Sequence, residues 1–423
     1  MLRARDRIGL SAHYFFAFAA IGFVVGFVPL FLKSRGLTLT QIGMLAAVYA
    51  LSGAAAQVPM GMLSDRLRRR KPLIVGGTLV LGASYLLYGL AESFAAFCAL
   101  YLVGGIVFFT IVTLTNALIS DWTVASRSTA ATFGRTRIWG SLGFILTLSL
   151  VSALPVIVEG ANLLPGIALL YWLSGMAIVP VSELERPGRQ PHAALSGVPK
   201  LLGNANLTVF LLAFLMYRLS EVSGMNYLSL YLQELGGNNS LIAMAFVASA
   251  VVEIPFMVWV GRASDRIGRR PPLVVAFLVL PLRLFLYSRL VDPMDVFFVQ
   301  MFHGLTFSFM LVSSLVFVAD LSPGELRATG QGLLNMTSGV AMAVGPFLGG
   351  WVADRTSISS MYGLLVWVAL GGALVFLLLV CESHPELSGD SRDPRPMSCP
   401  RFLRPLARIL FRPLIARRGK VAD

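Results

Sequence analysis

Apolar stretches of about 20 residues recur along almost the whole chain, and this recurrence restricts the fold more than any other feature. A helix needs roughly 20 apolar residues to cross a hydrocarbon core of about 30 Å, whereas a β-barrel would show shorter segments of alternating hydrophobicity. Only 13% of the 423 residues are charged, compared with about 25% in soluble domains. The sequence therefore predicts an all-α membrane protein with many crossings.

Twelve transmembrane helices are expected, in two groups of six. The first run, 8–32, is longer than the apolar region of about 7–15 residues in a cleaved signal peptide. A polar segment rich in glycine and proline separates the two groups, which is typical of a linker. The predicted helices cover residues 8–32, 41–63, 72–91, 95–118, 138–156, 163–181, 207–232, 240–262, 272–290, 294–320, 330–351 and 361–381. The predicted domains are an N-terminal six-helix bundle (1–181), a cytoplasmic linker (182–206), a C-terminal six-helix bundle (207–384) and a basic cytoplasmic tail (385–423).

The basic residues lie mostly on one side of the predicted membrane. With these helices, 28 of the 34 Lys and Arg residues fall on the side of the N-terminus and 4 on the other side. Because basic loops tend to stay in the cytoplasm, we expect both termini to be cytoplasmic and the protein to lie in the plasma (inner) membrane. The net charge of +13 then reflects topology, and no nucleic-acid partner is expected. The four histidines and three cysteines lie far apart in the sequence, so we expect neither a metal site nor a cofactor.

Two charged segments of similar sequence lie 200 residues apart. GMLSDRLRRRKPL (61–73) and GRASDRIGRRPPL (261–273), here called the first and second basic loops, are identical at eight of thirteen positions. Each joins the second predicted helix of its half to the third, and an aspartate ends the fourth helix of each half. This repeat predicts two pseudo-symmetric bundles around a central site. The residues expected to act as gates between the bundles are Gly61, Asp65, Arg66, Arg69, Arg70, Gly261, Asp265, Arg266, Arg269, Arg270, Asp121 and Asp320.

The repeated glycine and aspartate suggest that these loops do more than supply positive charge. A glycine lets neighbouring helices approach closely, an aspartate can accept hydrogen bonds from the start of the next helix, and arginines bind carboxylates. The family resemblance described below implies that such contacts break and re-form as the two bundles move. The alternative, in which the arginines only set the orientation of the chain, stays open.

Several segments resemble the major facilitator superfamily of secondary transporters, over roughly residues 8–381. The second basic loop fits the superfamily's loop motif at every defined position, whereas in the first loop Arg68 replaces the glycine of the motif. FGRTRIWGSLGF (133–144) and QMFHGLTF (300–307) are similar to the lactose-permease-like branch of phenylpropionate, nucleoside and oligosaccharide proton symporters. The resemblance implies alternating access, a small organic solute as substrate and protons as the coupling ion.

Five ionisable side chains lie well inside the predicted helices of the second half, away from the helix ends. Each costs roughly 2.5–3.5 kcal/mol at the centre of a span, so together they should line a watered cavity or pair with one another. Arg218 and Glu221 are three residues apart and can pair locally, whereas Glu253, Arg283 and His303 come from three helices. The resembling symporters carry their proton-coupling carboxylate, arginine and histidine in this half, so these five are the expected proton-coupling residues. Static pairing within the bundle is the alternative.

The expected contacts to the solute lie in the first half. In the sugar-carrying relatives the second arginine of the GRxR element touches substrate, and Arg137 matches that position. Tyr14, Phe18 and Asn116, with Trp139 nearby, complete the predicted substrate-binding set. In the alternative interpretation, Arg137 anchors the chain at the inner surface and the aromatic side chains only pack between helices.

A proton-driven symporter is the predicted function, and an efflux antiporter is the main alternative. The run from Gly339 to Gly350 resembles a motif of drug/proton antiporters, but those proteins carry it in helix five and here it falls in helix eleven. The sequence contains neither HExxH nor GxxxxGK[ST], which disfavours a membrane enzyme and an ATP-driven pump. A non-transporting sensor on the same fold stays an open alternative.

Overall fold

The computed structural model describes residues 4–67, 69–125, 130–183, 197–381 and 383, and every regular element among these residues is a helix. The predicted basic tail and most of the predicted linker lie outside the described residues. The side chains of Asp65, Asp121 and Asp265 lie outside them as well.

The first half contains six long helices joined by short connections. Two single 3₁₀ turns, η1 (Pro155–Val158) and η2 (Gly160–Asn162), join the fifth helix to the sixth. The six helices are α1 (Ala4–Ser34), α2 (Leu39–Leu67), α3 (Lys71–Tyr88), α4 (Phe94–Ala125), α5 (Ala130–Ala153) and α6 (Leu163–Ile178).

The second half follows a short linker helix, α7 (Val198–Leu202). Its fourth crossing, predicted as one helix over 294–320, is interrupted: η4 (Pro293–Asp295) and α11 (Val296–Met301) precede a π-helical turn, η5 (Gly304–Ser308), and α12 (Phe309–Leu321). A further 3₁₀ turn, η6 (Gly324–Leu326), precedes the next crossing. The remaining helices are α8 (Ala205–Glu234), α9 (Asn239–Ile267), α10 (Arg270–Ser288), α13 (Arg327–Arg355) and α14 (Ile358–Leu379).

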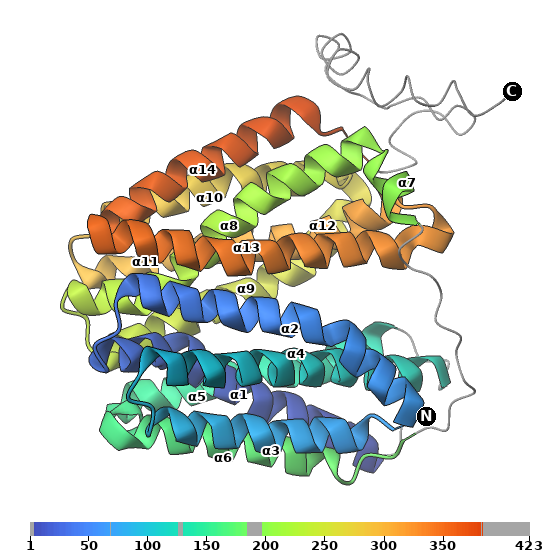
Figure 1. Ribbon diagram of the computed structural model, residues 1–423. Coiled ribbons are helices and arrows are strands. Elements are labelled where there is room, and N and C mark those ends of the chain that lie inside the picture. The colour runs from blue at the N-terminus through green and yellow to red at the C-terminus, as the bar shows by residue number, and fades with distance from the viewer. Residues whose placement is uncertain (1–3, 68, 126–129, 184–196, 382, 384–423) are drawn as a thin grey trace, which may run out of the picture.

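Successive crossings alternate in direction, so that the chain passes back and forth twelve times (Figure 1). Eleven of the described segments are long and apolar enough to span a membrane, and the twelfth, α6, is a shorter apolar helix. Both basic loops lie at the same end of the molecule as the start of α1, here called the basic end. The loops between α1 and α2 and between α13 and α14 lie at the other end, here called the opposite end.

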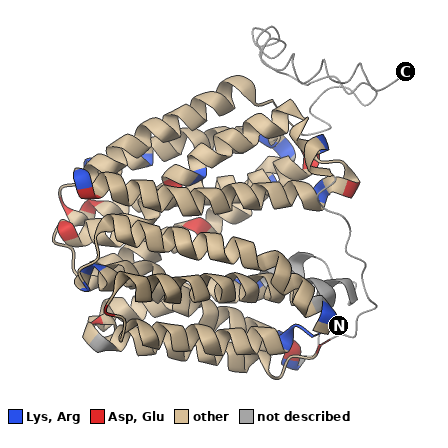
Figure 2. Ribbon diagram, viewed as in Figure 1, with Lys and Arg blue, Asp and Glu red and all other residues tan. Residues whose placement is uncertain are grey.

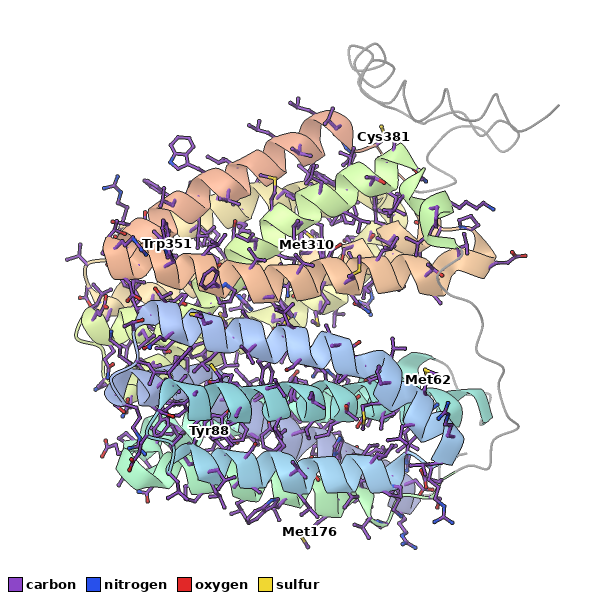
Figure 3. The ribbon with its side chains drawn as sticks, in the orientation of Figure 1. Met62, Tyr88, Met176, Met310, Trp351 and Cys381 are labelled. Carbon is purple, nitrogen blue, oxygen red and sulfur yellow. The ribbon has the colours of Figure 1, made fainter. Side chains whose placement is uncertain are left out.

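Charged residues gather at the two ends, and the middle of the molecule is largely free of them (Figure 2). Large apolar side chains instead cover much of the outer surface. Met176 projects outward from α6 with 65% of its surface exposed, whereas Tyr88 and Met310 are buried within their halves (Figure 3). An apolar outer belt between two charged ends is what a lipid bilayer requires.

Within the first half, two glycines let α5 lie directly against α1. A Cβ atom on Gly143 would lie 2.1 Å from the carbonyl oxygen of Phe15, and one on Gly140 would lie 2.9 Å from the ring of Phe18. Only a residue without a side chain allows this separation. Gly140 and Gly143 of the FGRTRIWGSLGF segment therefore set the distance between α5 and the aromatic residues of α1.

A buried histidine joins three helices of the same half. His13 on α1 is 2% exposed; its Nδ1 lies 3.1 Å from the carbonyl oxygen of Ser174 on α6, and its Nε2 lies 3.1 Å from Oγ1 of Thr115 on α4. Both ring nitrogens thus have partners, as buried polar groups require. This network fixes the position of α4, which carries Asn116 next to Thr115.

The two halves meet mainly through two pairs of helices, α2 against α13 and α5 against α9, and α1 also contacts α8. Figure 1 shows α2 and α13 close together at the opposite end and diverging toward the basic end. At the basic end of α2, Val58 and Met62 are exposed. A Cβ atom on Gly61 or Gly261 would meet nothing within 4 Å, so the close helix contact expected at these glycines is not made in this conformation.

Candidate functional site

The first half presents an aromatic and basic group at the interface between the halves. Tyr14 and Phe18, one turn apart on α1, stack with ring centroids 6.1 Å apart. The guanidinium carbon of Arg137 lies 3.9 Å above the Phe18 ring, and the Tyr14 hydroxyl donates to Oδ1 of Asn116 at 3.1 Å. Four of the five predicted substrate-binding residues are thus brought together from α1, α4 and α5.

The structure does not bring the fifth residue, Trp139, to this group. Residues two positions apart on a helix point in different directions, so Trp139 points away when Arg137 faces Phe18. Its side chain is 47% exposed.

Arg137 also interacts electrostatically with Glu253 on α9, which belongs to the other half. Glu253 is half-buried, and it also lies within electrostatic range of the like-charged Glu221 on α8. Glu253 was predicted to act with Arg283 and His303. The structure places it within electrostatic range of Arg137, an arginine of the predicted substrate site that belongs to the other half.

Arg283 occupies a buried polar network inside the second half. Its guanidinium donates to Oγ1 of Thr306 at 3.2 Å, to the Tyr287 hydroxyl at 3.0 Å and to Oε1 of Gln300 at 3.2 Å. Tyr287 also donates to Gln300 at 3.1 Å. Tyr287, Gln300 and Thr306 were not among the predicted site residues. Tyr287 could have been found, because it lies one helical turn from Arg283 on α10.

His303 lies directly before the π-helical turn that interrupts the fourth crossing of the second half. It is buried, stacks on Phe307 with ring centroids 5.4 Å apart, and lies within electrostatic range of Arg283. Among the described residues, its Nδ1 has no hydrogen-bond partner. Single π-helical turns of this kind occur frequently at functional sites.

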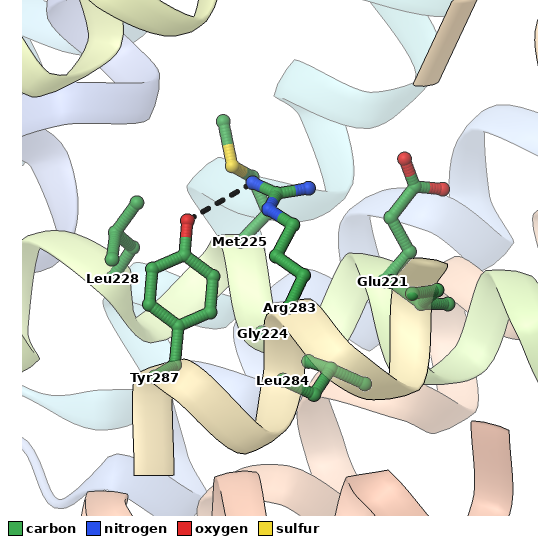
Figure 4. A pocket seen from close by; sticks show the side chains of 8 residues that line it. Glu221, Gly224, Met225, Leu228, Arg283, Leu284 and Tyr287 are labelled. Atoms are coloured by element: carbon green, nitrogen blue, oxygen red, sulfur yellow. Dashed lines mark hydrogen bonds between the residues drawn. The ribbon is translucent and has the colours of Figure 1, made fainter. Parts of the chain in front are cut away.

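Arg218 and Glu221 form the local ion pair that their spacing predicts. Glu221 lines a small pocket between α8 and α10, together with Arg283 and Tyr287 (Figure 4). Of the expected proton-coupling residues, Glu221 and Arg283 thus share one pocket, His303 lies near Arg283, and Glu253 faces the other half.

The second basic loop ties its half together at the basic end. Arg269 donates from Nε to the Asp320 carboxylate at 3.2 Å, and Arg270 donates to the carbonyl oxygens of Leu377 and Val380 at the end of α14. Gly268 adopts a φ of +95°, a conformation that favours glycine. Arg266 is exposed.

The first basic loop makes a different contact. The backbone amides of Arg70 and Lys71 donate to the carboxylate of Glu183, which in this way satisfies the first amides of α3. Arg66 and Arg69 are exposed. Whether Asp65, Asp121 and Asp265 contribute to gating remains a prediction, because their side chains lie outside the described residues.

The opposite end is closed by contacts between α2 and the second half that the sequence analysis did not predict. The carboxylate of Asp354 on α13 accepts hydrogen bonds from the amides of Leu39 (2.9 Å) and Thr40 (2.6 Å), at the start of α2. The Tyr227 hydroxyl on α8 lies 3.0 Å from the Leu39 carbonyl oxygen and 2.6 Å from that of Pro346 on α13. Between α5 and α9, Ser240 donates to the carbonyl oxygen of Ser152 at 2.7 Å.

Comparisons with known proteins agree with this architecture. The family model described as MFS_1 like family matches residues 7–364. The chain is similar to the maltose permease of Geobacillus stearothermophilus, with 24% identity over 86% of this chain and 92% of the relative. It is also similar to the xanthosine permease of Escherichia coli (strain K12), with 23% identity over 79% of this chain and 85% of the relative.

The fold also matches a solved structure. The crystal structure of the nucleoside transporter NupG aligns with a TM-score of 0.77 at 15% sequence identity, covering 88% of this chain and 98% of that one. The predicted all-α fold and the predicted resemblance are confirmed, and these relatives are transporters rather than enzymes. The protein is a multi-pass membrane transporter that belongs to the MFS_1 like family of the major facilitator superfamily.

Proposed function

We propose that this protein carries a nucleoside, or a related solute that contains a sugar ring, across the membrane by alternating access, together with protons. The observation that carries the proposal is the aromatic and basic group of Tyr14, Phe18 and Arg137, which lies within electrostatic range of Glu253 of the other half. Groups from both halves that meet at one place can bind a solute and respond to it together.

The chemistry of this group suits a flat ring joined to a hydroxylated sugar. Aromatic faces such as those of Tyr14 and Phe18 stack on nucleobases without regard to sequence or ring identity. The amide of Asn116, the guanidinium of Arg137 and the carboxylate of Glu253 can donate to or accept from ring nitrogens and hydroxyl groups. The names of the permeases similar to this chain support the same classes, a nucleoside in one and a sugar in the other.

Proton coupling follows from the charge of Glu253. A carboxylate in a membrane-embedded site is costly unless it is paired, and protonation removes its attraction for Arg137. A proton on Glu253 therefore frees Arg137 to bind the solute. Release of both ligands restores the charge pair, which favours the empty carrier and couples the two movements.

Alternating access is supported by the asymmetry between the two ends. The contacts of Asp354, Tyr227 and Ser240 close the opposite end, whereas α2 and α13 diverge toward the basic end (Figure 1). Because basic loops favour the cytoplasm, we place the basic end there and interpret this conformation as inward-facing. The plasma (inner) membrane is the location proposed with this orientation.

Uptake into proteoliposomes tests the proposal. The purified full-length protein would be reconstituted and offered labelled nucleosides and labelled maltose, with the outside acidic, with no pH gradient, or with the lumen acidic. We expect nucleosides to accumulate when the outside is acidic and only to equilibrate without a gradient. Accumulation only with an acidic lumen would indicate antiport, and movement of neither solute class would contradict the proposal.

A further inference from the structure

Among the residues that the structure describes, the buried arginine of the second half has no acidic partner in this conformation. Arg283 is 4% exposed, and within this part of the chain its guanidinium is held by the neutral oxygens of Thr306, Tyr287 and Gln300. Among the described residues, it forms no ion pair, and its Nε has no hydrogen-bond partner. Because arginine keeps its charge and a buried charge is costly without an opposite one, this arrangement is unfavourable unless a carboxylate reaches Arg283 at another stage.

Glu221 is the carboxylate placed to do so. It lines the same pocket as Arg283, and Figure 4 shows the carboxylate and the guanidinium extending in the same direction from α8 and α10. Glu221 currently pairs with Arg218, whose side chain is 21% exposed compared with 7% for Glu221. Water can therefore solvate Arg218 if Glu221 leaves it, whereas Arg283 is shielded from water.

We propose that Glu221 is a counter-ion shared by two arginines, which pairs with Arg218 when the opposite end is closed and with Arg283 when that end opens. The inference rests on the alternating access proposed above and adds to it a charge exchange within the second half. Each arginine then stabilises one of the two conformations, because each has its acidic partner in only one of them.

The other ionisable groups around Glu221 are compatible with this exchange. The Tyr217 hydroxyl, on the preceding turn of α8, lies within electrostatic range of Glu221, Arg218 and Arg283. Glu253 on α9 repels Glu221. On the far side of Arg283, His303 precedes the π-helical turn that carries Thr306.

A cysteine reporter at the opposite end tests the exchange. Cys98, Cys381 and Cys399 would be replaced by serine and Ser240→Cys introduced, because Ser240 contacts Ser152 of the other half only when that end is closed. Labelling by a membrane-impermeant maleimide would be measured on the full-length protein in an Asp354→Ala background. Loss of the Asp354 contacts should raise basal labelling, so that both an increase and a decrease can be detected.

The two arginine variants should move the reporter in opposite directions. We expect Arg218→Gln to raise the labelling rate and Arg283→Gln to lower it, each by about two- to fivefold, the range of a partly exposed ion pair. With Glu221→Gln added, neither arginine variant should change the rate further. Arg289→Gln, at the exposed residue directly after the helix that carries Arg283, is the matched control and should have no effect.

The failures of the two proposals can be told apart. If Ser240→Cys is labelled neither in the wild-type background nor with Asp354→Ala, the opposite end does not open and alternating access itself is contradicted. If Asp354→Ala raises labelling but both arginine variants shift it the same way, or shift it equally with Glu221→Gln present, the shared counter-ion is refuted. Size-exclusion profiles would confirm that each variant is folded. A variant that is not folded would be replaced by Arg218→Lys or Arg283→Lys, for which we expect a change of the labelling rate in the same direction but of smaller size.

Discussion

Arg137 combines two contacts that a lysine cannot reproduce together. Its planar guanidinium lies 3.9 Å above the Phe18 ring, and its charge interacts with Glu253 of the other half. A lysine at this position would keep the positive charge but would lose the stacked plane and the forked set of donors. A comparison of arginine with lysine at position 137 therefore distinguishes a role in solute binding, which needs the stacked guanidinium, from a role that needs only a positive charge.

Arg137→Lys should reduce the initial rate of solute uptake by about tenfold, because a cation–π contact in a desolvated site contributes about 1–2 kcal/mol. The measurement is uptake into proteoliposomes at equal protein density. Arg7→Lys, an exposed arginine on α1, serves as the matched control and should transport at the wild-type rate. Equal rates for both variants would show that Arg137 only anchors the chain.

Glu253→Gln should separate binding from coupling. The amide keeps the shape and can still contact the solute, but it cannot exchange a proton. We therefore expect exchange of labelled for unlabelled solute to continue, while accumulation driven by a pH gradient is lost. A variant that still accumulated solute against its gradient would remove Glu253 from the coupling mechanism.

The sequence predicted the ion-pair partner of a side chain correctly where that partner lies on the same helix. Arg218 and Glu221 are found paired because three residues on a helix bring two side chains to one face. The partner of Glu253 could not be predicted in the same way. Hydropathy gives the depth of a residue along a helix, but its partner depends on how α5 packs on α9, and Arg137 lies 116 positions earlier in the sequence.

At the scale of elements, two glycines determine how closely α2 and α13 approach at the opposite end. A Cβ atom on Gly43 would lie 2.2 Å from the Pro346 carbonyl oxygen, and one on Gly350 would lie 2.2 Å from that of Leu39. These distances are shorter than any real contact of a Cβ atom. The closed conformation of this end therefore requires glycine on both helices.

Gly350→Ala should keep the opposite end from closing fully. We expect faster maleimide labelling of Ser240→Cys and uptake reduced by about tenfold, since one half of the transport cycle is impeded. Gly363→Ala on α14 is the matched control, because its Cβ atom would meet nothing within 4 Å. Unchanged labelling in Gly350→Ala would mean that the opposite end still closes with a Cβ atom at this position, and that glycine is not required there.

The positions of the elements were largely predictable, whereas their interruptions were not. The sixth helix was expected over 163–181 and is found at Leu163–Ile178, because apolar length defines a crossing. The π-helical turn at Gly304–Ser308 leaves the composition of its crossing unchanged, so hydropathy could not reveal it. The contact of Asp354 with the start of α2 could not be predicted either, since acidic residues are common at helix ends and their partners cannot be read from the sequence.

At the scale of the whole molecule, the arrangement of charge gives a test of orientation. Both basic loops and the start of α1 share one end, and the loop between α13 and α14 lies at the other (Figure 1). The distribution of Lys and Arg predicts that the basic end is cytoplasmic.

In intact cells, Arg7→Cys should therefore be inaccessible to an impermeant maleimide, and Ser357→Cys should be labelled. Both would be made in a protein without its native cysteines. Cells opened by detergent provide the control, in which both positions should react. The reverse pattern in intact cells would place the basic end outside and invert the proposed inward-facing conformation.

The hydroxyl of Tyr227 has one proton and two acceptors, one in each half. When the halves part, the proton can remain with Pro346 in its own half, and only the Leu39 carbonyl is left to water. The Tyr227 hydroxyl therefore keeps an acceptor when the halves separate. No further hydrogen-bond donor has to lose its water when the halves come together again. We therefore expect this contact to add no large barrier of its own to the proposed separation of the two halves.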